Sequence, residues 1–226
     1  MKRARVLAIP DMHLPFCDWK KVQKVYELLK EHQFDYIVQL GDLKDRFTFS
    51  RFARPHDVMT PKEEVQEARD GAVNFWSQIH KLAPKAKKIQ LTGNHEERLI
   101  KSTLEKFPEI YSIIKKADQE MFKFAQVKTI YDSRAEFEID GVIYCHGYLT
   151  KLGDHAKHLL KPVVHGHTHR GGVIFFNLGG KTIWELDCGF LADPLQVPLM
   201  YGPTKTTLWT QGVGIVDAYG PRFIPL

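Results

Sequence analysis

The chain has 226 residues, of which 43% are hydrophobic and 26% are charged. This length and apolar content suit a globular protein with a substantial core and exclude an intrinsically disordered chain. No stretch approaches the ~18 to 20 apolar residues of a membrane span. The apolar run at residues 6–9 is too short for the core of a signal peptide. The net charge of +5 favours anionic partners, such as nucleic acid or phosphorylated molecules.

The three cysteines, Cys17, Cys145 and Cys188, are far apart and have no Cys-x-x-Cys spacing. An odd number of widely separated cysteines argues against a disulfide framework or a zinc knuckle. We therefore expect three small buried residues in a protein of the reducing cytoplasm.

The first half of the chain alternates apolar strands with amphipathic helices. Strands are predicted at 5–9, 36–40 and 88–91, and helices at 19–31, 60–82 and 96–116. Asp18 is a candidate cap for the first helix, and Thr60 with Glu63 forms a candidate capping box for the second. Pro108 is expected to break the third helical region.

The second half is rich in strands. They are predicted at 137–139, 142–145, 162–164, 173–176, 182–186 and 206–217. Asp140-Gly141 and Gly179-Gly180 each separate two of these strands and indicate hairpin turns. Strand–helix units followed by a strand-rich half predict a layered α/β architecture with mixed sheets, and not a pure Rossmann fold.

Five polar blocks follow predicted apolar strands directly or within one or two residues. They are Asp11-Met12-His13, Gly41-Asp42-Leu43-Lys44-Asp45, Gly93-Asn94-His95-Glu96, His146-Gly147 and Gly166-His167-Thr168-His169. Because α/β folds place their sites in the loops at the carboxyl ends of strands, we expect these blocks to converge in space. Each block alone could be an ordinary turn, helix cap or core histidine, whereas their joint occurrence in this order favours a site.

The residue types in the blocks suit a metal centre. Histidine and aspartate side chains with one asparagine are mixed nitrogen and oxygen ligands, which suit Mn, Fe, Zn, Co or Ni better than a pure calcium or magnesium site. A carboxylate can bridge two ions, and two ions about 3.5–4 Å apart can hold both the attacking and the leaving oxygen of a phosphoryl displacement.

These blocks, from Asp11 to His169, resemble the signature of the calcineurin-like metallophosphoesterases. The resemblance implies an α/β fold, a four-layer αββα sandwich with two mixed β-sheets and a two-metal site at one edge. Carried over by motif, it assigns the ligands as follows: Asp11, His13, Asp42 and His169 to the first metal, and Asp42, Asn94, His146 and His167 to the second. Asp42 would bridge the two ions. His95 would bind no metal, but would stabilise the transferring phosphoryl group or protonate the leaving oxygen.

Details of the blocks separate branches of this family. The run from Gly41 to Arg46 partly resembles the serine/threonine phosphoprotein phosphatases, but Phe47 stands where their pattern has glycine. The paired histidines His167 and His169 resemble the phosphodiesterase and nuclease-like branch. Residues 93–99 and 166–170 are also similar to small phage and bacterial phosphoesterases.

The resemblance therefore implies a phosphoesterase with two divalent transition-metal ions, Mn first and Fe, Zn, Ni or Co as alternatives, that hydrolyses its substrate with metal-activated water. A phosphodiesterase acting on nucleotides or nucleic acid is the leading hypothesis. A phosphomonoesterase or phosphoprotein phosphatase is the alternative, and a metal-dependent binding scaffold without turnover is a third.

Cationic side chains near the blocks are candidates to bind the substrate phosphate. They are Lys44, Arg46, Arg51 and Arg54 after the bridging aspartate, with Arg98 and Arg170 elsewhere. A solvated loop, or pairing of Arg98 with a neighbouring glutamate, is the alternative reading. Phe47, Phe49 and Phe52 either stack on a base or pack this loop onto the core. Asp45 is a candidate to orient a ligand or a bound water.

Residues 1–226 are expected to form one domain, with insertions near 43–60 and 147–161 that shape the pocket. His155 and His158 in the second insertion are expected to be exposed, not a third metal site. Beyond residue 200 the chain has no chemical motif. Trp184, Phe190, Leu191 and Trp209 are expected to serve packing.

Overall fold

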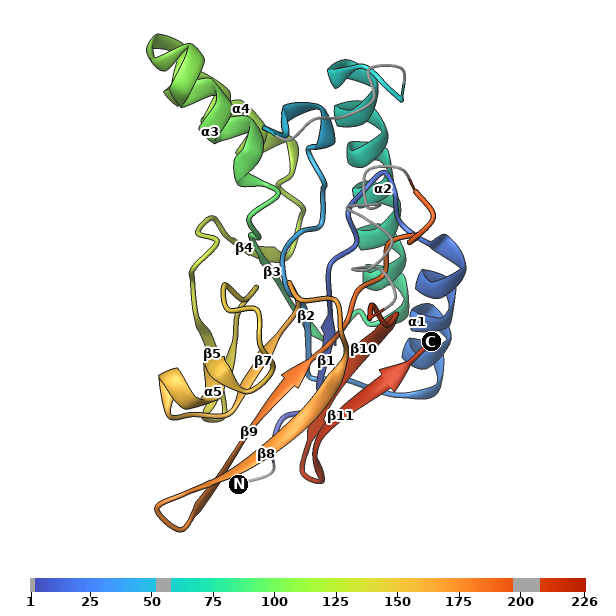
Figure 1. Cartoon of the computed structure of the whole chain (residues 1–226). Helices are drawn as coiled ribbons and strands as arrows, with labels where there is room; N and C mark the ends of the chain where they lie inside the picture. The colour runs from blue at the N-terminus through green and yellow to red at the C-terminus, as the bar shows by residue number, and fades with distance from the viewer. Residues whose placement is uncertain (1–2, 52–57, 197–207) are drawn as a thin grey trace.

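Two β-sheets pack face to face between outer helices in the computed structural model, which describes residues 3–51, 58–196 and 208–226 (Figure 1). The first sheet has the strand order β11-β10-β1-β2-β3-β4, and the second has the order β5-β6-β7-β9-β8. The strands of the first sheet are β1 (Val6–Ile9), β2 (Tyr36–Gln39), β3 (Lys87–Leu91), β4 (Val127–Ile130), β10 (Gly212–Asp217) and β11 (Gly220–Pro225). Those of the second are β5 (Phe137–Ile139), β6 (Val142–Tyr144), β7 (Val163–His165), β8 (Gly172–Leu178) and β9 (Lys181–Asp187).

Both sheets are mixed. Strands β1 to β4 run parallel to one another, whereas β10 pairs antiparallel with both β1 and β11. In the second sheet, β7 runs parallel to its neighbours β6 and β9, and the two edge strands are antiparallel.

The two faces of β1 contribute to two different cores, because successive side chains of a strand point to opposite faces. Leu7 and Ile9 pack beneath helices α1 (Trp19–Glu31) and α2 (Pro61–Leu82). Val6 and Ala8 face the second sheet and contact a cluster that includes its Tyr144. On the outer face of that sheet, the short helix α5 (Asp154–Leu159) packs over another cluster. The predicted four-layer αββα arrangement is therefore confirmed.

The predicted helix starts are also present. The Asp18 carboxylate accepts hydrogen bonds from the backbone of Lys20 and Lys21 at 3.0 and 3.4 Å. Thr60 and Glu63 form the reciprocal capping box at the start of α2. The helical region around Pro108 is broken as expected, into α3 (Glu97–Lys106), a 3-10 turn (Pro108–Ile110) and α4 (Tyr111–Met121).

Two strands differ from the prediction. The short edge strand β4 was not predicted, since its four residues include a lysine and a threonine and show no clear alternation. The closing strands form a hairpin, β10 and β11, and the second of them lies beyond the predicted end at residue 217. Residues 206 and 207 of the predicted strand lie outside the described part of the chain.

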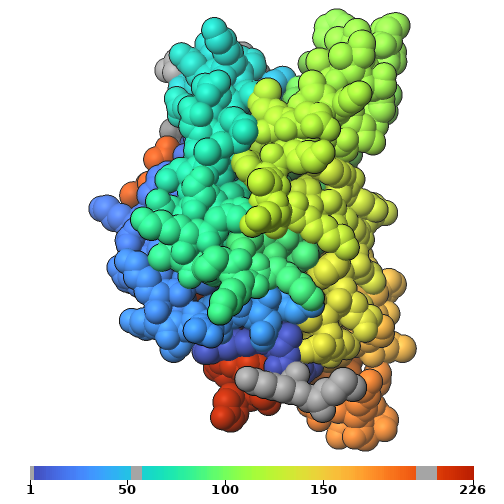
Figure 2. Space-filling view, turned by 180° about the vertical axis from the view of Figure 1, so that it is seen from behind, coloured from blue at the N-terminus to red at the C-terminus, as the bar shows by residue number. Residues whose placement is uncertain are grey.

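Helices α3 and α4 project from the body of the molecule on the same side as the start of α2 (Figure 1). From behind, helices α3 and α4 in yellow-green and the start of α2 in teal form two separate projections (Figure 2). None of the helices in the described ranges is long and apolar enough to cross a membrane. Cys17, Cys145 and Cys188 are buried free thiols, as expected.

Candidate metal centre

Hydrogen bonds from backbone amides join four of the five polar blocks at the carboxyl ends of the strands. The amides of Met12 and His13 donate to the carbonyl of Asp42 at 3.0 and 2.9 Å. The amide of His167 donates to both carboxylate oxygens of Asp11 at 3.1 Å. The amide of Gly166 donates to the carbonyl of His146 at 3.1 Å, which joins the last two blocks. Residues separated by more than 150 positions are thus held together.

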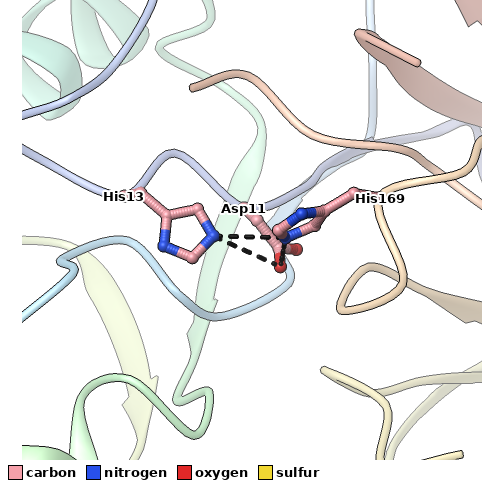
Figure 3. Close-up of side chains that lie close together, drawn as sticks. All are labelled: Asp11, His13 and His169. Atoms are coloured by element: carbon pink, nitrogen blue, oxygen red, sulfur yellow. Dashed lines mark hydrogen bonds and ion pairs between the residues drawn. The ribbon is translucent and has the colours of Figure 1, made fainter. Parts of the chain in front are cut away.

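Asp11, His13 and His169 form the first group of candidate ligands (Figure 3). His169 Nε2 lies 3.0 Å from Asp11 Oδ2 and 3.2 Å from His13 Nε2. His13 Nε2 lies 3.9 Å from the same carboxylate oxygen. All three residues are buried.

The Asp45 carboxylate fixes the tautomer of His13. His13 Nδ1 donates to Asp45 Oδ2 at 2.9 Å, so its Nε2 presents a lone pair toward Asp11 and His169. A carboxylate oxygen and two imidazole nitrogens then lie close together among buried residues. Such a collection of acceptors needs a proton or a cation between its members, and this fits a divalent metal ion.

The second group gathers around His146. Its Nδ1 donates to the carbonyl of Leu40 at 3.1 Å, so Nε2 is the free nitrogen. This Nε2 lies 3.0 Å from Asn94 Oδ1 and 3.3 Å from Asp42 Oδ2, both of which are acceptors. The ring of His167 packs edge-on against that of His146, with centroids 5.1 Å apart. Here too, the acceptor atoms around His146 Nε2 suit a cation.

Asp42 lies between the two groups. It clusters with Asp11 and His146 on one side, and with His13 and His95 on the other. In each cluster, the candidate ligand atoms all lie within 4.8 Å of one another. A single carboxylate that reaches both groups has the position required of a bridging ligand.

The buried charged side chains of the two groups shift one another's pKa values. Burial alone would raise the pKa of the Asp42 carboxyl, but His146 and His95 outweigh it and hold that pKa well below its usual value. Burial alone would lower the pKa of His146, but Asp42 and Asp11 raise it to about 10. Burial, aided by His146, lowers the pKa of His167 to about 4. Without metal, His146 therefore carries the proton that balances the carboxylates.

His95 lies beside this centre and is held on both ring nitrogens. Its Nδ1 donates to Asp45 Oδ2 at 3.1 Å, the same oxygen that accepts from His13. Arg98 donates from Nη2 to His95 Nε2 at 2.8 Å, and from Nη1 to Asp45 Oδ1 at 2.9 Å. Burial would lower the pKa of His95, but the carboxylates of Asp42 and Asp45 raise it. Asp45 thus orients one candidate ligand and the candidate catalytic histidine together.

Glu96 fixes the loops that carry Asp42 and Asn94. Its Oε2 accepts from the amides of Asp42 and Gly93 at 3.0 and 2.8 Å, and its Oε1 accepts from the amide of Lys44 at 3.1 Å. Gly93 allows this close approach, since a Cβ there would collide with the Asp42 carboxylate. The Gly-Asn-His-Glu block therefore contributes a structural anchor next to its candidate ligand.

Left-handed backbone conformations concentrate at the centre. Eight described residues other than glycine have a positive φ angle. Five of them lie in the polar blocks or directly beside one: His13, Asp42, Arg46, His167 and His169. Such conformations are unfavourable for residues with a Cβ and persist where the surrounding structure imposes them.

The cations after Asp42 turn away from the centre. Arg46 is fully buried, and its guanidinium pairs with Asp118 on α4. Lys44 pairs with the same carboxylate at 2.7 Å and lies 3.9 Å from the ring centroid of Phe122. These two candidate phosphate-binding residues therefore join helix α4 to the loop that follows Asp42. Phe47 packs into a hydrophobic cluster, as one of the two predictions for it stated.

The remaining substrate candidates have different surroundings. Arg51 and Arg170 are exposed, and Arg98 lies within the His95 network described above. Phe52 and Arg54 lie outside the described residues.

The prediction that His155 is exposed was wrong, whereas His158 is exposed as expected. His155 faces inward from α5, and its Nε2 accepts from the amides of Tyr148 and Leu149 at 3.0 and 3.1 Å. It lies beside His165 and Glu185, and these three residues also form a geometrically compact group. A six-residue helix is too short for its buried face to be read from periodicity.

The carboxylate of Glu185 is already satisfied by hydrogen bonds. Glu185 accepts from the amides of Gly153 and Ala156, both at 2.7 Å, and from His165 Nε2 at 3.0 Å. His165 Nδ1 donates to the carbonyl of Gly166 at 2.8 Å. Through His165, this network is bonded to the start of the Gly166–His169 loop. The Glu185 carboxylate needs no cation, because its oxygens already accept hydrogen bonds.

Sequence reasoning did not anticipate the roles of three residues. Glu185 lies 20 positions from His165, and only the sheet pairing brings them together. The rings of Phe190 and Trp209 surround the ligand candidate His169, and neither belongs to a motif. Both were expected to serve packing, and the structure shows that His169 is what they pack against.

Comparison with known proteins agrees with this geometry. Residues 4–171 match the family model described as calcineurin-like phosphoesterase. The Gene 54 protein of Mycobacterium phage D29 is 25% identical over 247 residues, which cover 98% of this chain and 93% of that protein. The Gene 54 protein of Mycobacterium phage L5 is 24% identical over 260 residues, with the same coverage of 98% and 93%.

Solved structures of Vps29 are similar at low identity. A single-substitution variant from Entamoeba histolytica has 13% identity and a TM-score of 0.44, with 98% of each chain covered. Vps29 from Chaetomium thermophilum has 12% identity and a TM-score of 0.45, with 96% of this chain and 80% of that chain covered. Scores of this size support no comparison of sites or partners.

Proposed function

Since this chain belongs to the calcineurin-like phosphoesterase family, we propose that it is a hydrolase that cleaves phosphodiesters of nucleotides or nucleic acid with the help of two divalent transition-metal ions. The observation that carries this proposal is the pair of buried histidine–aspartate groups that share Asp42. His95 lies beside them and is oriented by Asp45.

The residues fit two ions, because in each group acceptor atoms of carboxylate, imidazole or amide side chains face one another, and a cation can take the place of the proton that otherwise lies between them. Asp11, His13, Asp42 and His169 would hold the first ion, and Asp42, Asn94, His146 and His167 the second. When bound, such ions supply a hydroxide nucleophile near neutral pH and neutralise charge on the phosphate. Manganese is the proposed metal, because these mixed nitrogen and oxygen ligands suit it, and Fe, Zn, Ni or Co remain alternatives.

The chain's own residues perform the other tasks. Asp45 fixes the ring of His95 with the proton on Nδ1, which directs Nε2 away from the carboxylate. That nitrogen lies 2.8 Å from Nη2 of Arg98, so a phosphate oxygen that displaced this contact would meet both side chains. In its protonated form, which the raised pKa favours, His95 would also carry a proton on Nε2, and with it would stabilise the transferring phosphoryl group or protonate the leaving oxygen. Arg98, with the exposed Arg51 and Arg170, is proposed to bind the phosphate.

The inward position of Arg46 supports a diester over a monoester. A phosphomonoester carries nearly two negative charges at neutral pH, whereas a diester carries one. Arg46 and Lys44 are both paired with Asp118, so their charges are compensated within the protein. A substrate with the smaller charge suits a site to which these two cations are not available. Nucleotides or nucleic acid are proposed as the source of the diester because the chain carries a net charge of +5.

The test is hydrolysis of bis(p-nitrophenyl) phosphate and p-nitrophenyl phosphate, side by side, on protein stripped of metal and reloaded with Mn²⁺. Diester turnover that requires Mn²⁺ is expected. Asp42→Asn and His146→Ala should abolish it, whereas Asp70→Asn, an equal charge change on the exposed side of α2, should not. Turnover of the monoester alone would favour a phosphomonoesterase or phosphoprotein phosphatase. Metal binding without turnover of either would favour a binding scaffold.

The proposal also covers the organisation and location of the chain. Residues 1–226 would act as one domain, with the segments near 43–60 and 147–161 shaping the pocket. A cytoplasmic location is proposed because the three cysteines are buried free thiols, which suits a reducing compartment.

A further inference from the structure

Two aromatic rings enclose the imidazole of His169. Phe190 stacks on it, with centroids 5.0 Å apart and an interplanar angle of 20°. Trp209 meets it edge-on, with centroids 4.7 Å apart and an angle of 82°. The two aromatic rings also contact each other at 5.3 Å. The imidazole is therefore confined by two rings, one of which is stacked on its face.

The backbone fixes Trp209 relative to His169. The amide of Thr210 donates to the carbonyl of His169 at 2.8 Å, and the amide of Phe190 donates to the carbonyl of Thr210 at 3.3 Å. Gln211 forms an isolated parallel bridge with Phe190. Trp209 lies outside residues 4–171, the part of the chain that matches the family model. A segment beyond the family core thus reaches one of the candidate ligands.

His169 differs from the other two oriented histidines in how its ring is held. His13 and His146 are each fixed by a hydrogen bond from Nδ1, to Asp45 and to the carbonyl of Leu40. Within residues 3–51, 58–196 and 208–226, the hydrogen bonds of the His169 ring are made by Nε2, toward Asp11 and His13, and none by Nδ1. Its backbone also has a φ angle of 61°, which is unfavourable for a residue with a side chain. The orientation of the His169 ring must therefore be fixed by another contact.

We propose that Trp209 is a positioning residue for the first metal, and that its indole holds the His169 imidazole with Nε2 directed at Asp11 and His13. The contact replaces the hydrogen bond that orients a ligand histidine from behind. This inference rests on the proposed function, because it takes His169 as a metal ligand.

The test is a titration of the full, metal-stripped chain with Mn²⁺ by calorimetry. Two binding events are expected for the wild type, and His169→Ala identifies the event that involves His169. Trp209→Ala should weaken that event about tenfold or more, as loss of an orienting partner does, and leave the other within about twofold. Trp209→Phe should retain most of the affinity, because a ring remains against the imidazole. Trp19→Ala, at the exposed start of α1, is the matched control and should bind as wild type does.

Tryptophan fluorescence gives a second readout that does not depend on activity. Mn²⁺ should change the emission of the wild type and of Trp19→Phe, and most of that change should disappear in Trp209→Phe.

Wild-type affinity for both ions in Trp209→Ala would overturn the inference, and so would equal weakening of both events together with a lower melting temperature. If the wild type bound no Mn²⁺ or other transition-metal ion, the proposed function would fail and this inference with it. Normal wild-type binding with an unaffected Trp209→Ala variant would refute the inference alone.

Discussion

Replacing Asp45 by asparagine should impair metal binding and the chemical step together. The side chain is fully buried, and its two oxygens accept from His13 and His95 at 2.9 and 3.1 Å and from Arg98 at 2.9 Å. Asparagine has one acceptor oxygen and one amide nitrogen. If the oxygen faces the two histidines, the amide meets the guanidinium of Arg98, and if the amide faces the histidines, their Nδ1 protons lose their acceptor.

The size of the effect follows from the number of bonds lost. In either orientation at least one charge-assisted hydrogen bond becomes a donor–donor contact, which costs about 1.5–3 kcal/mol. At about 1.4 kcal/mol for each factor of ten, kcat should fall roughly 10- to 150-fold at saturating Mn²⁺. The affinity for the ion that involves His13 should fall about 10- to 100-fold, the usual effect of removing an orienting partner.

The assay is diester hydrolysis over a range of Mn²⁺ concentrations, with metal binding followed by calorimetry. Asp70→Asn supplies the control for the loss of one negative charge, because Asp70 is exposed on α2. The reasoning would be refuted by an Asp45→Asn protein that retains both the wild-type kcat and the wild-type metal affinity.

Three further changes test other parts of the site. His95→Asn should keep both ions, measured by metal analysis, while turnover falls by about 10²- to 10⁴-fold; full activity would remove His95 from its proposed role. Since Asp42 and Asp11 raise the pKa of His146 to about 10, this ring must lose a proton to bind metal, and Mn²⁺ affinity measured between pH 6 and 9 should rise up to about tenfold per unit. A flat profile would contradict this. Glu64→Ala should reduce the free energy of unfolding in urea by about 3 kcal/mol, because buried Glu64 accepts hydrogen bonds from Phe47 and Thr48; an unchanged unfolding midpoint would disprove its anchoring role.

The elements nearest the site were the easiest to predict from the sequence. Apolar strands followed at once by His, Asp or Asn are a local signal, and the parallel arrangement of strands then places their ends together. The helix starts at Asp18 and Thr60 were also local, since each cap bonds to an amide within three residues. Properties that depend on near neighbours in the chain were therefore predicted correctly.

The direction of individual side chains could not be predicted, because it depends on distant partners. Arg46 turns inward toward Asp118, which is 72 positions away. His155 is buried by Glu185 on β9, and the ring of Trp209 reaches His169 from the far end of the chain. Neither composition nor periodicity records which charges will be paired with each other and which remain for a substrate.

The left-handed residues around the candidate metal centre have a consequence for directed evolution. His13, Asp42, His167 and His169 each adopt a conformation that costs about 1–2 kcal/mol for a residue with a Cβ and nothing for glycine. Glycine at these positions would relieve that cost, although it would also make the unfolded chain more flexible. A library screened only for heat resistance would thus tolerate, and at some positions enrich, the substitutions that remove the candidate ligands. Screens for more durable variants of this protein need a selection for metal binding at every round.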